Sequence, residues 1–131
     1  MAGASGFHQA AVQLDGVDQQ QKGLRAAVDA GQLWMEAGVA EAAAKRCEQT
    51  VDEIDKWLRD ADPLAQTCEF GDNKDGNAAA QRFFDAGREY VATVRQAQQV
   101  FRHMAATFRA AGRTAGEADS ASEQSLKGRS E

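Results

Sequence analysis

The clearest pattern in the chain is a set of apolar and small residues that recurs at regular intervals between positions 80 and 118. The spacing between its successive members alternates between three and four residues. An α-helix turns once every 3.6 residues, so this spacing aligns the run along one stripe, as in the seam of a coiled coil. The pattern predicts a long helix over residues 76–119. The larger side chains of its core-facing seam are Phe83, Tyr90, Val94, Phe101, Met104 and Phe108.

A second seam predicts another long helix over residues 11–62. Its early and later parts meet in the alanine run at 42–44. Alanine is the best helix former, so the apolar face can change direction there without a break in the helix. The residues of this helix that we expect in the core are Gly31, Met35, Gly38, Val51, Ile54, Trp57 and Leu58.

The segment 63–75 separates the two predicted helices. It holds the single proline, Pro63, and a Gly-Asp-Asn cluster, which are typical of a turn. Asp72, followed by Asp75 three residues later, is the expected N-cap of the second helix. Two long helices on one short connection predict an all-α fold, an antiparallel helical hairpin.

A close turn at the end of the first helix predicts a register in which facing residue numbers sum to about 139. Gly31 then faces Phe108, and Gly38 faces Phe101. Glycine in a helix costs about 0.5–1 kcal/mol relative to alanine. These glycines are therefore interpreted as sockets for the aromatic rings, and the alternative is that they are merely tolerated.

The two tryptophans have different expected roles. Trp57 lies near the predicted turn, where Leu64, Phe70 and Phe83 can cover it, so we expect it to be a buried cap of the closed end of the hairpin. Trp34 flanks the early seam and has two interpretations. It belongs to the core of a larger bundle, or it is an exposed anchor for a partner.

The second helix carries more apolar surface than one partner helix covers, because Phe84 and Val91 flank the seam on one side and Val100 on the other. This width predicts that two hairpins pair into a four-helix bundle. Arginines recur at seven-residue intervals from Arg88 to Arg109, either as a solvated face or as an ion-pairing surface for an acidic partner helix. The candidate partner-interface residues are Trp34, Phe84, Val91, Val100, Arg95 and Arg102.

The composition supports helices and narrows the function classes. The 131 residues include 27 Ala and 13 Gln but one Ile and one Tyr, which excludes a strand-rich fold. The net charge of −5 argues against nucleic acid as the main partner. The absence of a run of 18 apolar residues predicts no stable membrane insertion, although the amphipathic second helix leaves a membrane-surface role open.

The two ends of the chain are polar. Residues 1–10 are small and polar and lack the charged start and apolar core of a secretory signal, so we expect a flexible N-terminus. Residues 120–131 are expected to form a disordered tail, because they offer too little apolar surface for a core.

No residue pattern points to catalysis or to a cofactor. Cys47, Cys68 and the two histidines lack the spacing of zinc or di-iron ligands. We expect two reduced thiols, with a disulfide between them as the less favoured alternative. The segment 71–77 lacks the alternating acids and the final Glu of a calcium loop. The sequence therefore predicts no metal, no cofactor and no enzymatic activity.

Two segments carry a resemblance to a known family: FGDNKDGNAAAQRF at 70–83 and FRHMAATFRAAGRTAGEAD at 101–119. In a small, acidic, Ala- and Gln-rich helical hairpin, they resemble the WXG-like proteins of actinobacterial type VII (ESX) secretion systems. The resemblance implies a non-enzymatic protein that forms a homodimer, or a heterodimer with another helical hairpin. It also implies export in the folded state by the membrane ATPase of the secretion machinery, and so an extracellular or cell-surface location reached without a signal peptide.

The chain departs from that family in two places. The family's turn carries Trp-X-Gly, whereas this chain has Trp57-Leu58-Arg59. The family's export signal places an aromatic residue four positions before an acid, whereas Ala115 precedes Asp119 here. A partner that carries the signal would explain the second difference. The alternative is a cytoplasmic helical adaptor, or a toxin-associated accessory protein, that binds a partner helix.

Overall fold

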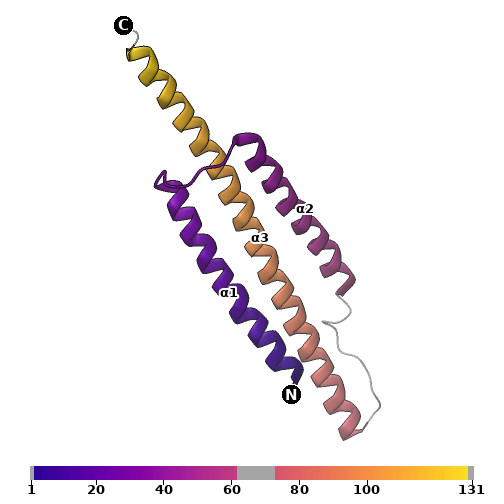
Figure 1. The fold of residues 1–131 in the computed structure, drawn as a ribbon. Helices are drawn as coiled ribbons and strands as arrows, with labels where there is room; N and C mark the ends of the chain where they lie inside the picture. Colours follow the sequence, from indigo (N-terminus) through magenta and orange to yellow (C-terminus); the bar gives the residue numbers. More distant parts are fainter. Residues whose placement is uncertain (1, 62–72, 130–131) are drawn as a thin grey trace.

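The computed structural model describes residues 2–61 and 73–129. Within these ranges the chain is all-α and forms three helices: α1 (Ala2–Asp29), α2 (Ala37–Ala61) and α3 (Lys74–Arg129). α3 is the longest, and α1 and α2 lie along its two sides (Figure 1). The described residues of α1 and α2 make no contact with each other. The fold is therefore an open bundle organised around α3.

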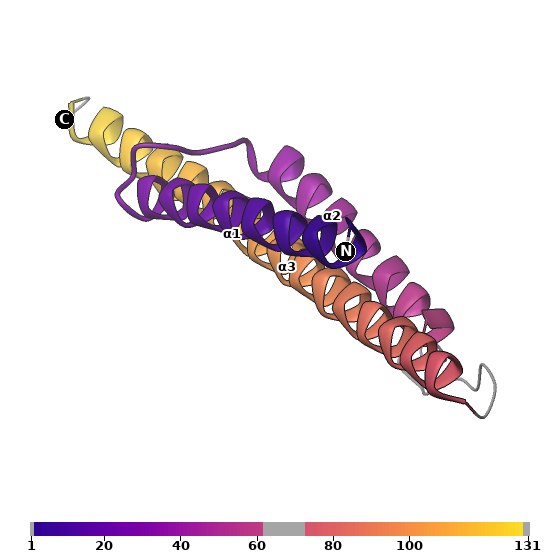
Figure 2. The same cartoon turned by 90° about the horizontal axis from the view of Figure 1, so that it is seen from below.

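The chain runs up, down and up again (Figures 1 and 2). α2 is antiparallel to α3, whereas α1 is parallel to it. Two hydrogen bonds show the parallel direction: the Gln96 side-chain amide donates to the Ala11 carbonyl, and the Thr114 hydroxyl donates to the Val28 carbonyl. The all-α class is confirmed, but the expected two-helix hairpin is not: α1 is a third helix, which lies beside the antiparallel pair α2–α3.

The expected single helix over residues 11–62 is wrong, because the chain leaves the helix after Asp29. Gly31 adopts a left-handed conformation, with a φ of 75°. Its N–H donates to the Val28 carbonyl at 3.0 Å, and the next N–H, of Gln32, donates to the Ala27 carbonyl at 2.9 Å. These two bonds form a Schellman motif, which satisfies the last carbonyls of α1 and ends the helix.

Glu36 begins the next helix. Its carboxylate accepts the N–H groups of Gly38 and Val39 at 2.9 and 3.1 Å, as an N-cap side chain does. Gly31 therefore ends α1 and Gly38 lies in the first turn of α2, so the expectation that they form core sockets for Phe108 and Phe101 is wrong. A Cβ at Gly31 would meet no atom within 4 Å, and one at Gly38 would meet only the Glu36 carboxylate.

The ends of the other elements also differ from the prediction. The structure makes residues 2–10 part of α1 and residues 120–129 part of α3, where we expected a flexible N-terminus and a disordered tail. Residues 62–72, which include most of the expected turn and the expected N-cap Asp72, lie outside the described residues. α3 begins at Lys74, and the Asn73 side chain caps it by accepting the Gly76 N–H at 2.6 Å.

The register of α2 on α3 differs by about three helical turns from the one expected. Gln98 donates to the Val51 carbonyl, and Arg109 reaches Glu41, so facing residue numbers sum to about 150 instead of 139. A tight turn between the helices would have imposed the smaller sum. The packing of α2 against α3 sets the larger one.

The core consists mainly of small side chains. Ala44, Cys47 and Ala105 are buried between α2 and α3, and the partly buried seam residues Phe101, Met104 and Phe108 pack around them. Val28, Ala110 and Ala111 form a second cluster at the end of α1, against which Met35 packs. Val51 and Ile54 are also buried on α2. No large side chain in the described ranges is completely buried.

α2 and α3 approach each other closely at Gly112. A Cβ built on this glycine would lie 2.9 Å from the Ala40 Cβ and 3.6 Å from the Ala37 Cα. Real Cβ atoms do not come so close to each other, so only glycine fits at this point of α3. Gly112 of α3 therefore makes room for Ala40 of α2, a role that we had expected of Gly31 and Gly38 toward aromatic rings.

Candidate interaction surfaces

α3 presents two separate faces to its surroundings. Because α1 and α2 lie on opposite sides of it, two strips of α3 remain between them, one on each side of the open bundle. Residues seven apart in an α-helix fall almost on the same line. One strip, which we call the arginine face, carries Arg88, Arg95, Arg102, Arg109 and Arg113. The other, which we call the apolar face, carries Phe83, Tyr90, Val94, Phe101, Met104 and Phe108.

The arginine face is lined on the α2 side by acids. Arg109 forms ion pairs with both Glu41 and Glu48, and its Nε lies 3.2 Å from Glu41 Oε2. The hydrogen bond from Arg109 lowers the pKa of the Glu41 carboxyl, and the two carboxylates raise the pKa of the Arg109 guanidinium. Glu41, Glu48 and Asp55 are seven residues apart, so the acids of α2 run alongside the arginines of α3.

The same face is lined on the α1 side by polar residues. His103 Nδ1 lies 2.7 Å from Asp18 Oδ1, and this hydrogen bond lowers the pKa of the Asp18 carboxyl. Arg25 donates to the Ala106 carbonyl at 3.4 Å. These contacts establish which flank of α1 borders the arginine face.

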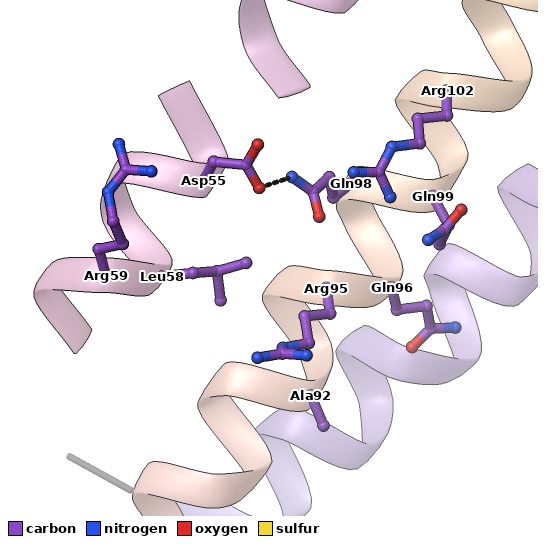
Figure 3. Close-up of a pocket in the computed structure, with 9 residues that line it drawn as sticks. All are labelled: Asp55, Leu58, Arg59, Ala92, Arg95, Gln96, Gln98, Gln99 and Arg102. Atoms are coloured by element: carbon purple, nitrogen blue, oxygen red, sulfur yellow. Dashed lines mark hydrogen bonds between the residues drawn. The ribbon is translucent and has the colours of Figure 1, made fainter. Parts of the chain in front are cut away.

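A groove of about 750 Å³ opens on the arginine face between α2 and α3 (Figure 3). Arg95 and Arg102 extend into it from α3, Leu58 points across from α2, and Arg59 stands at its outer edge (Figure 3). Within the described residues, none of these three arginines has an ion-pair partner. The groove is therefore a locally cationic site in a chain of net charge −5.

One carboxylate, Asp55, also lines this groove, and Gln98 holds it. The buried Gln98 amide donates to Asp55 Oδ1 at 2.6 Å and to the Val51 carbonyl at 3.0 Å (Figure 3). The amide nitrogen thus uses both of its hydrogens on α2. Asp55 is bound to an amide in this arrangement and not to either neighbouring arginine.

The apolar face continues onto both flanking helices. On α2, Val39 and Trp57 are 18 residues apart, which is five full turns, and they lie half a turn from the acids of the arginine face. On α1, Val17 and Leu24 lie on the flank opposite Asp18. All four of these apolar side chains are exposed. The apolar face is therefore bordered on both sides by exposed apolar groups.

The expectation that Trp57 is a buried cap is wrong, because 53% of this residue is exposed. Phe83, which was expected to cover it, is also exposed at 41%, whereas Leu64 and Phe70 lie outside the described residues. The helical periodicity of α2 directs Trp57 to the apolar face, away from the line of Val51 and Ile54 that contacts α3.

The six predicted interface residues fall in different places. Trp34 is 58% exposed in the connection between α1 and α2. Phe84 and Val91 are partly buried, and the Arg88 guanidinium lies 5.6 Å from the centre of the Phe84 ring. Arg95 and Arg102 line the groove. The assignment of Val100 to a partner interface is wrong: it is 5% exposed, because α1 covers this flank of α3.

Sequence reasoning missed the polar residues that attach α1 to α3. The buried Gln21 side chain donates to the His103 carbonyl at 3.1 Å and to the Thr107 hydroxyl. Gln21 occupies a seam position, and its polarity was a signal that the seam faces polar groups. The seven-residue spacing of Glu41, Glu48 and Asp55 was a second missed signal, because it matches the arginine spacing at a sum of 150.

The structure shows Cys47 as a free thiol in the α2–α3 core, and burial raises its pKa. Cys68 lies outside the described residues. In the part of the chain that the structure describes, no group of His, Cys, Asp and Glu side chains could hold a metal ion. No helix in these ranges carries an apolar stretch long enough to cross a membrane.

Comparisons with known proteins found no similar family, relative or structure: no family model, no curated protein and no solved structure matches the chain.

Proposed function

We propose that this protein is a non-enzymatic interaction module that pairs through its apolar face with a second helical protein. The observation that carries the proposal is the set of exposed apolar side chains on α1 and α2, Val17, Leu24, Val39 and Trp57, which border the partly buried seam of α3. α1 and α2 do not contact each other over this seam. One helix of a partner laid over this seam would contact all three helices and complete a four-helix bundle. The partner is a second copy of this chain or another helical hairpin.

The exposed area supports this proposal. The chain exposes 9119 Å², whereas a compact monomer of its mass exposes about 6700 Å². The last turns of α3 project beyond the flanking helices (Figure 1). A standard interface buries about 800 Å² on each partner, which is well within the difference.

We further propose that the pairing serves type VII secretion, with this chain as a secreted substrate or a co-secreted partner. The support is the resemblance at residues 70–83 and 101–119 and the antiparallel α2–α3 pair. In this role the chain depends on the membrane ATPase of the secretion machinery. Its final location is extracellular or on the cell surface.

A second candidate is a cytoplasmic helical adaptor or a toxin-associated accessory protein. Ala115 favours it, because this residue stands where the export signal of the WXG-like family carries an aromatic side chain, and it is buried. The same apolar face would then hold a helix of the partner protein.

Fractionation of the native host distinguishes the two candidates. The protein is measured in culture filtrate and in cell lysate, with the type VII ATPase present and deleted. A filtrate signal that disappears on deletion supports secretion. Retention in the lysate of both strains contradicts secretion and favours the adaptor.

The pairing itself is tested by sedimentation of the purified chain, alone and with its co-purified partner. Leu24→Asp and Trp57→Asp place a charge on the apolar face and should abolish the complex. Val12→Asp is the matched control, because Val12 is at least as exposed as Leu24 and Trp57 but lies on the side of α1 away from α3. Equal loss in the control, or no loss in either face variant, contradicts the proposal.

A further inference from the structure

The arginine face places a row of acids on α2 beside a row of arginines on α3, which we call the charge ladder, and two of these arginines have no ion-pair partner among the described residues. In the observed register, Glu41, Glu48 and Asp55 of α2 run antiparallel to Arg109, Arg102 and Arg95 of α3, one acid to each arginine. Both sets repeat every seven residues, about 10.5 Å along each helix. A complete ladder would pair all six residues within the chain.

The observed pairs do not follow that ladder. Arg109 pairs with both Glu41 and Glu48, and Asp55 accepts the Gln98 amide. Within the described residues, Arg102 and Arg95 form no ion pair with these acids. Arg95 and Arg102, seven residues apart on the same face of α3, therefore have no ion-pair partner among the described residues. Arg59 of α2 lines the same groove.

The arginines that remain are suited to carboxylates from outside the chain. A guanidinium is a planar fork of N–H donors that matches the two oxygens of a carboxylate, and it stays charged at every physiological pH. Leu58 and Ala92 give the groove an apolar patch between the charges. Arg109 already shows the mode of binding, because it holds two carboxylates that are seven residues apart on one helix.

We propose that this groove docks an acidic amphipathic helix of a protein partner, with carboxylates seven residues apart that pair with Arg95 and Arg102. An apolar side chain of that helix lies between them, against Leu58. A nucleic acid or another polyphosphate fits less well, because Glu41, Glu48 and Asp55 run along the same face and repel a continuous polyanion. This surface is on the opposite side of α3 from the apolar face, so the proposal does not depend on the proposed pairing.

The test uses a fluorescein-labelled helical peptide of about 20 residues, based on alanine and glutamine, with Glu at seven-residue intervals and Leu between them. A matched peptide carries Gln in place of each Glu. Binding to the full chain is followed by fluorescence anisotropy at about 50 mM and about 300 mM NaCl. We expect the Glu peptide to bind, the Gln peptide to bind at least about tenfold more weakly, and salt to reduce the difference.

The variant R95E/R102E should weaken binding of the Glu peptide at least about tenfold and should bind a peptide with Lys at the same positions. The control R46E/R82E changes the net charge by the same amount, at exposed arginines away from the groove, and should bind like the unmodified chain. Equal loss in the control, or full binding by R95E/R102E, overturns the proposal.

Two further outcomes would also overturn it. If heparin displaces the Glu peptide and itself binds more tightly, the groove is a phosphate- or sulfate-binding site. If no peptide binds, and Arg102→Gln lowers the melting temperature as much as Arg109→Gln does, the ladder is completed within the chain in solution. The Leu24→Asp and Trp57→Asp variants should bind the Glu peptide normally, which separates this result from a failure of the proposed pairing.

Discussion

The two helices that flank α3 are attached to it in different ways. α2 packs through alanines and Cys47, with a close approach at Gly112, and its polar contacts border this contact line. α1 makes apolar contacts near its two ends, through the Phe7 ring on Tyr90 and through Val28. Between Phe7 and Val28, the residue of α1 that is buried is polar: Gln21, whose side chain donates to the His103 carbonyl.

This difference predicts two levels of stability within one small fold. Close apolar packing opens only when the whole pair of helices separates, whereas a helix held by a few polar contacts can open locally. We therefore expect α1 to leave α3 more readily than α2 does.

The largest expected effect is at the close approach of α2 and α3. Gly112→Leu forces a side chain into the Ala40 contact and should lower the free energy of unfolding by about 1–3 kcal/mol, even after the gain in helix propensity. The control is Gly116→Leu, one turn later in α3, where a Cβ meets no atom within 4 Å. The control should raise stability by about 0.5–1 kcal/mol. Thermal unfolding followed by circular dichroism measures both, and a Gly112→Leu variant as stable as the control would contradict the observed register.

The next effect concerns α1 alone. Gln21→Ala leaves the buried Thr107 hydroxyl and the His103 carbonyl without this donor, which should cost the docking of α1 about 1–2 kcal/mol. Amide hydrogen exchange should become faster in α1 and stay unchanged in α2. The exposed neighbour Gln20→Ala is the control and should change neither. Faster exchange in α2 as well would show that the helices do not open separately.

A smaller effect depends on pH. The His103 hydrogen bond lowers the pKa of Asp18 in the folded chain, so opening of α1 takes up a proton in acid. The stabilisation is therefore complete above the ordinary carboxyl pKa of about 3.9 and is lost as the pH falls through the lowered value. Exchange in α1, corrected for intrinsic rates, should reveal this loss at low pH. Asp18→Asn should remove this part of the pH dependence, whereas Asp15→Asn should retain it.

The smallest expected change is in the reactivity of Cys47. Burial between α2 and α3 raises the pKa of this thiol, so it should react slowly with a disulfide reagent at neutral pH until α2 separates. A Cys68→Ser background isolates its signal. Gln21→Ala should leave the rate unchanged, and Gly112→Leu should increase it. A faster reaction in the Gln21→Ala variant would mean that α1 protects the α2–α3 core.

α3 was the most predictable element, because its three-and-four spacing continues without interruption and the helix spans the whole predicted range. The break between α1 and α2 was not predictable from spacing, since Gly31 falls on a seam position. Its left-handed backbone, which ends the helix, leaves no mark on the apolar pattern. The all-helical class followed from pattern and composition, but the number of helices depended on one glycine.

The candidate surfaces were predicted less well than the helices. Arg95 and Arg102 are exposed, as their seven-residue spacing along the polar side indicated, and their role at a partner interface stays a prediction. The exposure of Val100 was predicted wrongly because it depends on where α1 lies against α3. That position is hard to predict, because polar side chains such as Gln21 contribute to the contact and leave little apolar pattern in the sequence. The prediction that Trp57 is buried was wrong because it assumed a close turn and a register that would bring Phe83 over the indole ring.

The parallel course of α1 and α3 has a consequence for how the chain is made. The side-chain hydrogen bonds of α2 with α3 join residues 43 to 68 positions apart, whereas those of α1 with α3 join residues 81 to 86 positions apart. The residues that α1 contacts, from Tyr90 to Thr114, leave the ribosome long after α1 itself. Most of the stability of a helix in a protein comes from packing of one face against its neighbours. We therefore expect α1 to remain without a stable partner during most of translation, while α2 and α3 associate first.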